Sequence, residues 1–259
     1  MDELIASAEA AADLAGAAIR PLFRSHLLVE AKGDASPVTE ADRAAERALR
    51  DHIARHHPDH GVIGEEYGPD RPDAEWVWVL DPIDGTRAFL TGRPLFGTLI
   101  ALLHRGRPVL GIIDQPAGGE RWLGVEGRPT RFTGPFGGTV GCRPCPDLSA
   151  AELASTSPDI FPPGQDGGFR ALRGAVRRVS WGGDCYIYGL LALGLIDVVV
   201  DATMKVWDWA ALVPVVEGAG GRVTDHAGRP LTLDSDGTVM AVGDASLLPA
   251  VTRLLGGGA

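Results

Sequence analysis

The sequence has few cysteines, no long apolar run and no surplus of basic residues. Three cysteines in 259 residues are too few for a disulfide framework. No run of 18 apolar residues occurs, so we expect no membrane span. The N-terminal MDELIASAEA lacks the basic start of a secretory signal. With 24 Lys and Arg against 34 Asp and Glu, the net charge is −10, which argues against a nucleic-acid partner. These absences together predict a cytoplasmic protein.

The composition that remains is that of a globular protein, with 45% hydrophobic and 22% charged residues, and the length suits one large domain or two small ones. Apolar residues at three- and four-residue steps predict an amphipathic helix over residues 3–24. A second helix is expected over 40–56. Its start is marked by Thr39 and Asp42, which resemble a capping box, and its end by Pro58.

The chain then changes from helices to strands and later to alternating elements. Strands are expected at 75–80, 96–103, 109–113 and 121–124. Residues 128–146 are rich in Gly, Pro, Arg and Thr and are the candidate boundary. Beyond it, strands are expected at 152–156, 196–200, 222–224 and 238–242, and helices at 186–195, 209–217 and 245–255. We therefore expect an α+β portion over 1–142 and an α/β portion over 143–259.

The most informative segment is Asp81-Pro82-Ile83-Asp84-Gly85-Thr86, which follows an apolar strand. We expect the strand to deliver Asp81 at its end, with Asp84 in the turn after it. Two crowded carboxylates repel each other unless a cation lies between them, and hard oxygen ligands suit Mg²⁺. The carbonyl of Ile83 is a further candidate ligand. The alternative is an Asx-turn with both acids in solvent.

Two other acidic motifs fit the same reading. Glu65 lies in Gly-Glu-Glu (64–66) after an apolar stretch, and Asp208 lies between two tryptophans at a helix start. Burying an unpaired carboxylate is unfavourable, so a bound cation would explain the position of Asp208 between the two tryptophans. Taken singly, Asp208 could be a helix cap and Glu65 a solvated loop acid.

These motifs carry a family resemblance. GEE (64–66), DPIDGT (81–86), WD (207–208) and EGAGG (217–221) resemble the inositol monophosphatase superfamily of metal-dependent phosphatases, over essentially the whole chain. RAFLTGRPLFGTLIALL (87–103), GIIDQP (111–116), STSPDIF (155–161) and GGDCYIYGLLA (182–192) look like its histidinol-phosphate phosphatase branch. Inositol-specific members have Thr-Asn where this chain has Arg87 and Ala88. The resemblance implies a layered αβαβα sandwich of the inositol monophosphatase and fructose-1,6-bisphosphatase type, and a homodimer.

The resemblance also implies a site with two or three Mg²⁺ ions. The implied metal ligands are Glu65, Asp81, the carbonyl of Ile83, Asp84 and Asp208. The implied catalytic residues are Glu65, Thr86 and Asp42. Glu65 and Thr86 would orient the attacking water, and Asp42 would polarise the Thr86 hydroxyl. Lys32 matches a family lysine near the metals. Implied substrate contacts are Asp84, Gly85, Thr86, Gly182, Gly183, Asp184 and Asp201. Inositol enzymes have Gly-Thr-Ala where this chain has Gly182-Gly183-Asp184, so an acid here favours a cationic substrate group.

The function we expect is Mg²⁺-dependent hydrolysis of a small phosphate monoester, L-histidinol phosphate in histidine biosynthesis, by metal-activated water. Alternatives are inositol 1-phosphate or another sugar or nucleotide monoester, or a catalytically inactive module that binds phosphate or metal. A covalent phosphoaspartate mechanism would use Asp-x-Asp, a spacing that Asp81 and Asp84 do not have.

Two other patterns do not predict a site. Cys142 and Cys145 form one CxxC with no second pair, which is weak evidence for zinc or redox chemistry. Four histidines lie near the end of the second predicted helix, at positions 52, 56, 57 and 60, without the glutamate of an HExxH zinc motif. We interpret them as a helix end in solvent.

Overall fold

The computed structural model describes residues 1–25, 30–31 and 37–256. The helices are α1 (Asp2–Ile19), α2 (Glu40–His56), α3 (Thr86–Leu90), α4 (Asp166–Ala175), α5 (Asp184–Ala192), α6 (Val206–Trp209), α7 (Leu212–Gly218) and α8 (Leu248–Gly256). The first nine strands are β1 (Glu30–Ala31), β2 (Pro37–Val38), β3 (Gly61–Gly64), β4 (Gly68–Asp70), β5 (Trp76–Asp84), β6 (Gly97–His104), β7 (Arg107–Gln115), β8 (Glu120–Val125) and β9 (Arg128–Thr133). The remaining strands are β10 (Glu152–Ser155), β11 (Arg178–Trp181), β12 (Val198–Asp201), β13 (Arg222–Thr224) and β14 (Val239–Val242).

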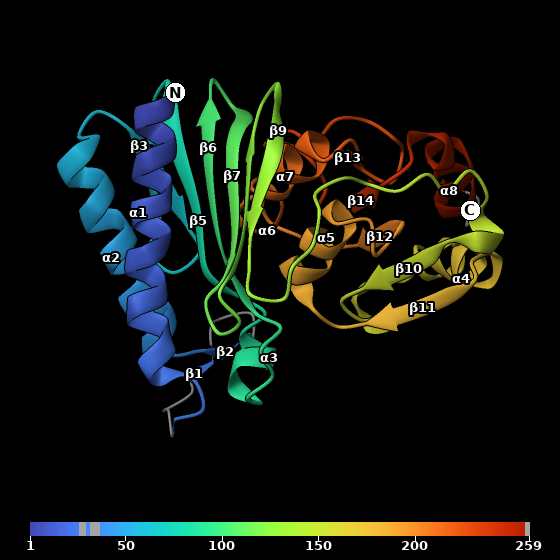
Figure 1. The fold of residues 1–259 in the computed structure, drawn as a ribbon, viewed down its shortest axis with the longest axis horizontal. Coiled ribbons are helices and arrows are strands. Elements are labelled where there is room, and N and C mark those ends of the chain that lie inside the picture. The colour runs from blue at the N-terminus through green and yellow to red at the C-terminus, as the bar shows by residue number, and fades with distance from the viewer. Residues whose placement is uncertain (26–29, 32–36, 257–259) are drawn as a thin grey trace.

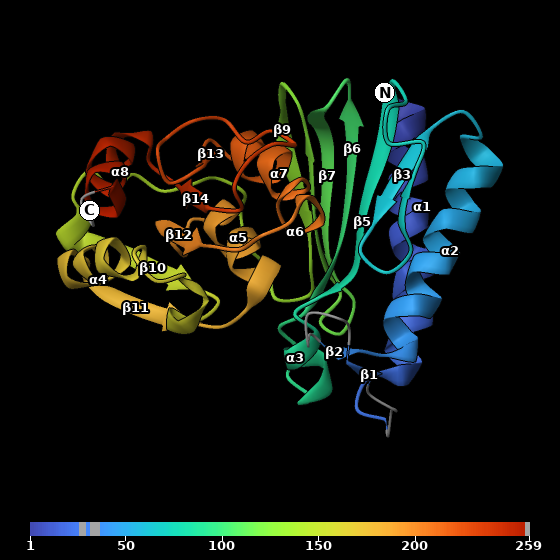
Figure 2. The same ribbon diagram turned by 180° about the vertical axis from the view of Figure 1, so that it is seen from behind.

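The elements stack in five layers. A seven-stranded sheet of order β4-β3-β5-β6-β7-β8-β9 has α1 and α2 on one face and α5, α6 and α7 on the other (Figure 1). Those three helices also cover a five-stranded sheet of order β11-β10-β12-β14-β13, whose far face carries α4 and α8 (Figure 2). This confirms the αβαβα sandwich.

The alternation of side chains along β5 shows how the layers form. Val77 and Val79 pack into the core that contains α5, α6 and α7. Trp78 and Leu80 point the other way, into the core formed with α1 and α2. Because successive strand residues face opposite sides, a strand covered on both faces has an unbroken apolar run. That explains the sequence WVWVL.

The second sheet has its own core on the side of α4 and α8, while its other face belongs to the core of the seven-stranded sheet. Val199 and Ala241, from β12 and β14, lie in that common core with Val77 and Val79 of β5. The two portions of the chain therefore share buried surface. The predicted division after residue 142 falls between β9 and β10, and it stays a prediction.

Several predicted bounds need correction. The first helix ends at Ile19, not at 24, because Arg20–Leu22 forms a 3-10 turn with Pro21 at its start. Residues 128–146 do contain regular structure, since β9 pairs with β8. The helix expected at 209–217 is two helices, α6 and α7, joined by Ala210 and Ala211. We did not predict β3, β4, β11 or α4, which are short or weakly patterned.

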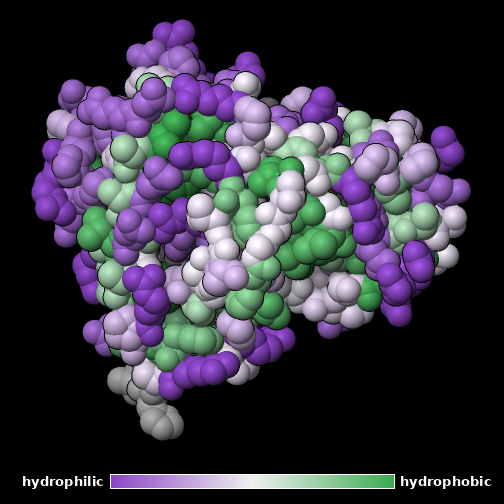
Figure 3. Space-filling model, viewed as in Figure 1, coloured by the Kyte–Doolittle hydropathy of each residue, from purple (hydrophilic) through white to green (hydrophobic). Residues whose placement is uncertain are grey.

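Within the described residues, no helix is both long and apolar enough to cross a bilayer. Figure 3 shows the face of Figure 1 with mainly hydrophilic residues along its edges and hydrophobic ones scattered between them.

Candidate metal centre

A β-bulge brings Asp81 and Asp84 to the same side of the sheet. Asp81 pairs with Leu99 of β6 and Asp84 pairs with Gly97, so three steps along β5 match two along β6. Without the extra residue, positions i and i+3 would face opposite sides. Pro82 is tolerated here because a bulge releases it from the ladder. The strand thus continues to Asp84, and our expectation that Asp84 lies in a turn after the strand was wrong.

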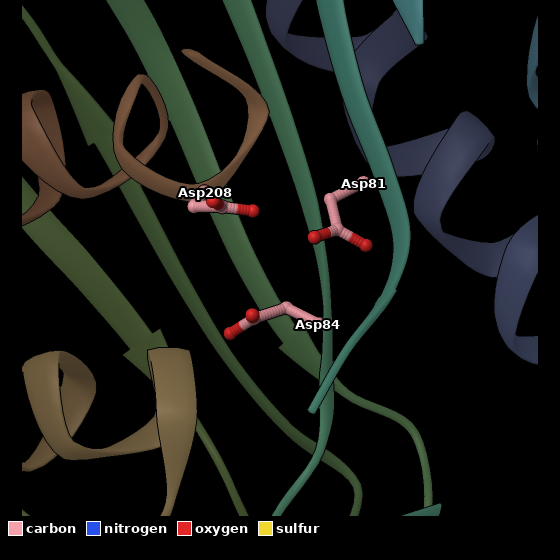
Figure 4. A group of neighbouring side chains, drawn as sticks. All are labelled: Asp81, Asp84 and Asp208. Atoms are coloured by element: carbon pink, nitrogen blue, oxygen red, sulfur yellow. The ribbon is translucent and has the colours of Figure 1, made fainter. Parts of the chain in front are cut away.

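Asp208 reaches the same point from the other portion of the chain. It lies in the first turn of α6, where its carboxylate accepts a hydrogen bond of 2.6 Å from the backbone N–H of Lys205. One carboxylate oxygen from each of Asp81, Asp84 and Asp208 lies within 4.8 Å of the others (Figure 4). Asp208 therefore caps its helix and also faces the two aspartates of β5.

The electrostatics of this cluster favour a cation. Burial, followed by repulsion from Glu65, Asp84 and Asp208, raises the pKa of Asp81 well above its usual value. Burial likewise raises the pKa of Asp84, and that of Asp208 to about 7. One oxygen of Asp81, Oδ1, is buried with no hydrogen-bond partner. Crowded carboxylates with an unsatisfied oxygen are the donor set that a hard divalent cation satisfies.

Glu65 begins the turn that follows β3, and its charge acts on Asp42, Asp81 and Asp208. The turn is fixed from α2 by Glu46, a residue that the sequence did not single out. The buried Glu46 carboxylate accepts hydrogen bonds from the backbone of Glu66 (2.7 Å) and Tyr67 (3.2 Å).

Two neighbours show how closely Glu46 fits this turn. Arg50, one helical turn along α2, pairs with Glu46 at 2.8 Å. Gly64 precedes the turn, and a Cβ at that position would collide with the Glu46 carboxylate. The i,i+4 spacing of Glu46 and Arg50 predicts their ion pair from the sequence. Only the fold shows that the Glu46 carboxylate also holds the turn after β3.

Thr86 opens α3 directly beyond the bulge. Its hydroxyl lies 3.1 Å from the carbonyl oxygen of Ile83 and 3.5 Å from Asp42 Oδ1. A hydroxyl has a single proton, so these acceptors compete, and the shorter contact is with Ile83. The other oxygen of Asp42 accepts from the N–H (2.8 Å) and hydroxyl (2.6 Å) of Thr39, which confirms the predicted capping box.

The N-terminus of α5 faces this cluster. Gly182 and Gly183 have φ of +83° and +110°, a backbone conformation that glycine adopts without strain. The turn presents the half-buried Asp184, whose carboxylate lies so close to Gly85 that a Cβ there would be 2.8 Å from it. Burial, followed by the charge of Asp201, raises the pKa of Asp184 to about 6.

A cavity of about 190 Å³ joins these groups. Its lining includes Asp84, Asp184, Asp201 and Asp208. Asp201 is 3% exposed, and its carboxylate accepts hydrogen bonds from the backbone of Thr156 and the hydroxyls of Ser155 and Tyr188. A larger cavity, about 500 Å³, lies between the β8–β9 hairpin and α7 and contains none of the predicted site residues.

The predicted residues outside the cluster have separate outcomes. Lys32 lies outside the described residues. Cys142 and Cys145 are free thiols. The histidine cluster is only partly in solvent: His56 is exposed as we expected, whereas His52 and His57 are largely buried and both contact the hydroxyl of Ser7, at 2.9 and 2.8 Å.

Comparison with known proteins agrees with this geometry. The model described as "Inositol monophosphatase family" matches residues 1–254. The chain belongs to the inositol monophosphatase family. Like the enzymes of that family, it is a phosphatase, and those enzymes use Mg²⁺ and act on phosphate monoesters.

Individual members of the inositol monophosphatase family are also similar to the chain. A bifunctional phosphatase IMPL2, chloroplastic, from Arabidopsis thaliana is 44% identical over 93% of this chain and 69% of its own length. A histidinol-phosphatase from Chlorobaculum parvum is 39% identical, covering 84% of this chain and 83% of its own. The structure of an inositol monophosphatase from Zymomonas mobilis is 49% identical, with a TM-score of 0.89 and 98% of both chains covered.

Proposed function

We propose that this chain is a Mg²⁺-dependent phosphatase that hydrolyses L-histidinol phosphate to L-histidinol and phosphate. The observation that supports the metal is the convergence of Asp81, Asp84 and Asp208 within 4.8 Å, with one buried Asp81 oxygen left without a partner. Glu65 and the carbonyl of Ile83 complete the proposed ligand set, and Glu46 holds the turn that contains Glu65. Two or three ions are proposed, since four carboxylates around one ion would leave excess negative charge.

Bound Mg²⁺ would supply positive charge to the phosphate oxygens and lower the pKa of water. The residues of the chain do the positioning. Thr86 presents its hydroxyl at the cluster, and we assign it and Glu65 to orienting the attacking water. Asp42 accepts the hydrogen bond from the Thr86 hydroxyl when the Ile83 carbonyl is engaged by another partner. The backbone N–H groups of Gly85 and Thr86, at the start of α3, are the proposed phosphate donors.

The leaving-group side of the cavity is acidic. The carboxylate of Asp184 accepts no hydrogen bond within the described part of the chain, so it is available to a substrate donor. Asp201 already has three internal donors and contributes chiefly its charge. An ammonium or imidazolium group suits this surface through charge-assisted hydrogen bonds. Gly182 and Gly183 are proposed to let the substrate approach the backbone.

Parallel phosphate-release assays test the substrate. Purified protein with Mg²⁺ is given L-histidinol phosphate or inositol 1-phosphate, and kcat/KM is compared. We expect a preference for L-histidinol phosphate, and an at least equal rate with inositol 1-phosphate would reject it. The relative named histidinol-phosphatase supports this substrate.

The second candidate substrate is inositol 1-phosphate or another sugar or nucleotide monoester. It is favoured by the 49% identity to a solved inositol monophosphatase. A catalytically inactive binding module is disfavoured because the predicted acids within the described residues are present and converge. Failure to release phosphate from any monoester would restore that alternative.

Assembly, location and pathway are part of the same proposal. We propose a homodimer, a cytoplasmic location and a step in histidine biosynthesis. A homodimer fits the family resemblance, and Phe136, which is 77% exposed, is a candidate contact. Light scattering coupled to size-exclusion chromatography measures the mass, and a single-chain mass of 27.2 kDa would contradict the dimer.

A further inference from the structure

Thr203 follows β12 and has a left-handed backbone, with φ +64°. Threonine is β-branched, and such residues rarely adopt positive φ because the branch crowds the backbone. Among the described residues, the other non-glycine residues with positive φ are Arg24, Arg71, Arg105 and Asp184, and none of them is β-branched. Strained residues persist where surrounding structure fixes them, and they cluster at functional sites.

The position of Thr203 connects this strain to the candidate site. It lies two residues after Asp201 and lines the cavity that contains Asp84, Asp184 and Asp208. The residue is exposed, so its side chain is not needed to fill a core. Packing therefore gives no reason for a threonine where glycine or asparagine would be less strained.

The backbone around Thr203 is fixed from a distant segment. The N–H of Met204 donates to the carbonyl of Gly237 at 2.9 Å. Gly237 has φ +88°, and a Cβ there would lie 2.7 Å from the Met204 carbonyl oxygen. Two chain segments are thus in close contact beside Thr203, and the hydrogen bond between Met204 and Gly237 constrains the backbone that follows it.

Thr203 lines the cavity, and its hydroxyl oxygen can accept a hydrogen bond. Its proton is donated to the carbonyl of Ala202 at 2.6 Å, which leaves its lone pairs free to accept. The hydroxyl of Tyr188, also in the lining, is likewise used, since it donates to Asp201 at 3.0 Å. With the carboxylate of Asp184, this wall offers acceptors, which select a leaving group that carries hydrogen-bond donors.

We propose that Thr203 is a specificity-determining residue that accepts a hydrogen bond from a donor on the alcohol portion of the phosphate monoester. The donor is an ammonium or imidazole N–H group in L-histidinol phosphate. This inference rests on the proposed phosphatase function and adds to it a residue that recognises the leaving group by a hydrogen bond. The backbone strain is retained because the threonine hydroxyl serves that recognition.

The test compares Thr203→Gly and Thr203→Ser with the wild type on three substrates: L-histidinol phosphate, inositol 1-phosphate and phenyl phosphate, whose leaving group has no amine or extra hydroxyl. Thr203→Gly relieves the strain, so its Tm should rise by about 2–4 °C. Its kcat/KM should fall about tenfold for the donor-bearing substrate that the wild type prefers, the loss of one hydrogen bond to a charged group. Phenyl phosphate hydrolysis should change less than twofold. Thr203→Ser keeps the hydroxyl and should retain the preference.

Arg105→Asn is the matched control, because Arg105 also has positive φ, +50°, but lies in the β6–β7 turn away from the cavity. Asn-Gly suits that turn, so Tm should rise while all three activities stay constant. Equal losses of kcat/KM on donor-bearing substrates and phenyl phosphate, or no loss on either, would overturn the role of Thr203. A wild type that prefers inositol 1-phosphate removes the histidinol phosphate proposal but still allows the Thr203 ratio to be measured. A wild type inactive on all three substrates rejects both proposals.

Discussion

Asp84 of β5 accepts a hydrogen bond of 2.5 Å from the backbone N–H of Cys185, in the first turn of α5. The bond links a carboxylate of the bulged strand to the helix that presents Asp184. The charge of Asp84 thus experiences opposite effects: the N–H of Cys185 stabilises it, and the carboxylates of Asp184 and Asp208 oppose it. The charge of Asp84 matters for metal binding, whereas its shape matters for the contact with α5.

Asp84→Asn separates these two roles. The asparagine oxygen can still accept from Cys185, so the fold should persist, but a ligand charge is lost. We expect kcat to fall by about 10² to 10⁴, the range for several kcal/mol of lost transition-state stabilisation. The metal-free variant should melt at a higher temperature than the wild type, because a crowded buried charge is removed. Phosphate release and thermal melts with Mg²⁺ or EDTA measure both effects.

Asp114→Asn provides the matched control. Asp114 is also buried, but its carboxylate is paired with Arg121 at 2.6 Å, away from the cluster. Its replacement should lower Tm, since the arginine loses a charged partner, and should leave kcat nearly constant. Full activity in Asp84→Asn would exclude Asp84 as a metal ligand.

The contribution of the carboxylate cluster to the stability of the metal-free protein should fall as pH rises from 5 to 8. Burial and mutual repulsion raise the pKa values of Asp81, Asp84 and Asp208 in the folded state above the ordinary 3.8. The folded chain then holds protons that the unfolded chain has released. The associated stability is complete below the unfolded pKa and is lost as pH rises through the folded values, about 7 for Asp208.

Thermal melts in EDTA across this pH range measure the slope. Mg²⁺ binds the deprotonated carboxylates, so its addition should reduce or reverse the trend. Asp208→Asn should flatten the slope in EDTA. A metal-free Tm that increases between pH 6 and 8 would contradict the proposed proton uptake.

Local signals predicted much of the fold and of the candidate site. The helix at 40–56 and its capping box were predicted because Thr39 and Asp42 interact within one turn of the chain. The first part of β5 was predicted because both faces of residues 76–80 are covered and that stretch is apolar. Asp81 and Asp84 were recognised as a pair from their spacing and the family motif.

The features that were missed depend on distant contacts. The bulge at Asp81–Asp84 is a mismatch with β6 and cannot be read from β5 alone. Glu46 looks like the acid of an ordinary surface ion pair until the fold brings the Glu65 turn to it. The strained φ of Thr203 occurs where the next residue, Met204, is hydrogen-bonded to Gly237, more than thirty residues along the chain. Tertiary packing decides such features, so local propensity does not predict them.

Glu46→Gln tests whether the α2 carboxylate positions Glu65. The substitution keeps the side-chain shape but weakens the hydrogen bonds to the turn and removes the charge that pairs with Arg50. We expect a loss of about 1–3 kcal/mol in unfolding free energy. The Mg²⁺ concentration for half-maximal activity should rise about tenfold, as for other residues that orient a metal ligand. Activity at saturating Mg²⁺ should largely recover.

Glu75→Gln is the control for Glu46→Gln, because Glu75 makes exposed ion pairs with Arg105 and His104. Such pairs contribute about 0–1 kcal/mol, so neither stability nor the Mg²⁺ requirement should change much. An unchanged Mg²⁺ requirement in Glu46→Gln would show that Glu46 is structural only.

Thr86→Val tests the proposed role of the Thr86 hydroxyl. Valine has a similar shape but cannot donate to Asp42 or Ile83 or orient water. We expect kcat to fall by about 10² or more, in the range of proton-transfer and positioning effects. Thr86→Ser, which keeps the hydroxyl, should stay within about tenfold of the wild type. Equal losses in both variants, measured by phosphate release at saturating Mg²⁺, would assign the effect to packing.

Phosphate binding should depend on the metal. Five acids belong to the proposed site or its water: Asp42, Glu65, Asp81, Asp84 and Asp208. Their combined charge is roughly −5 when ionised, and about three Mg²⁺ would change it to roughly +1. Without metal, phosphate would meet these acids and the Asp184 carboxylate beside Gly85. The arginines whose charges act on Asp184, Arg87 and Arg93, are exposed and offer weak compensation.

Calorimetric titration with inorganic phosphate at pH 8, with either Mg²⁺ or EDTA, measures this dependence. We expect binding with Mg²⁺ and an affinity at least about a hundredfold weaker in EDTA, since two decades correspond to under 3 kcal/mol of favourable charge interaction. Asp84→Asn should bind phosphate weakly under both conditions, because it retains most of the negative charge but loses a ligand. Tight phosphate binding in EDTA would mean that protein groups alone hold the anion. The acidic net charge of −10 would then need a basic subsite to explain recognition of an anionic ester.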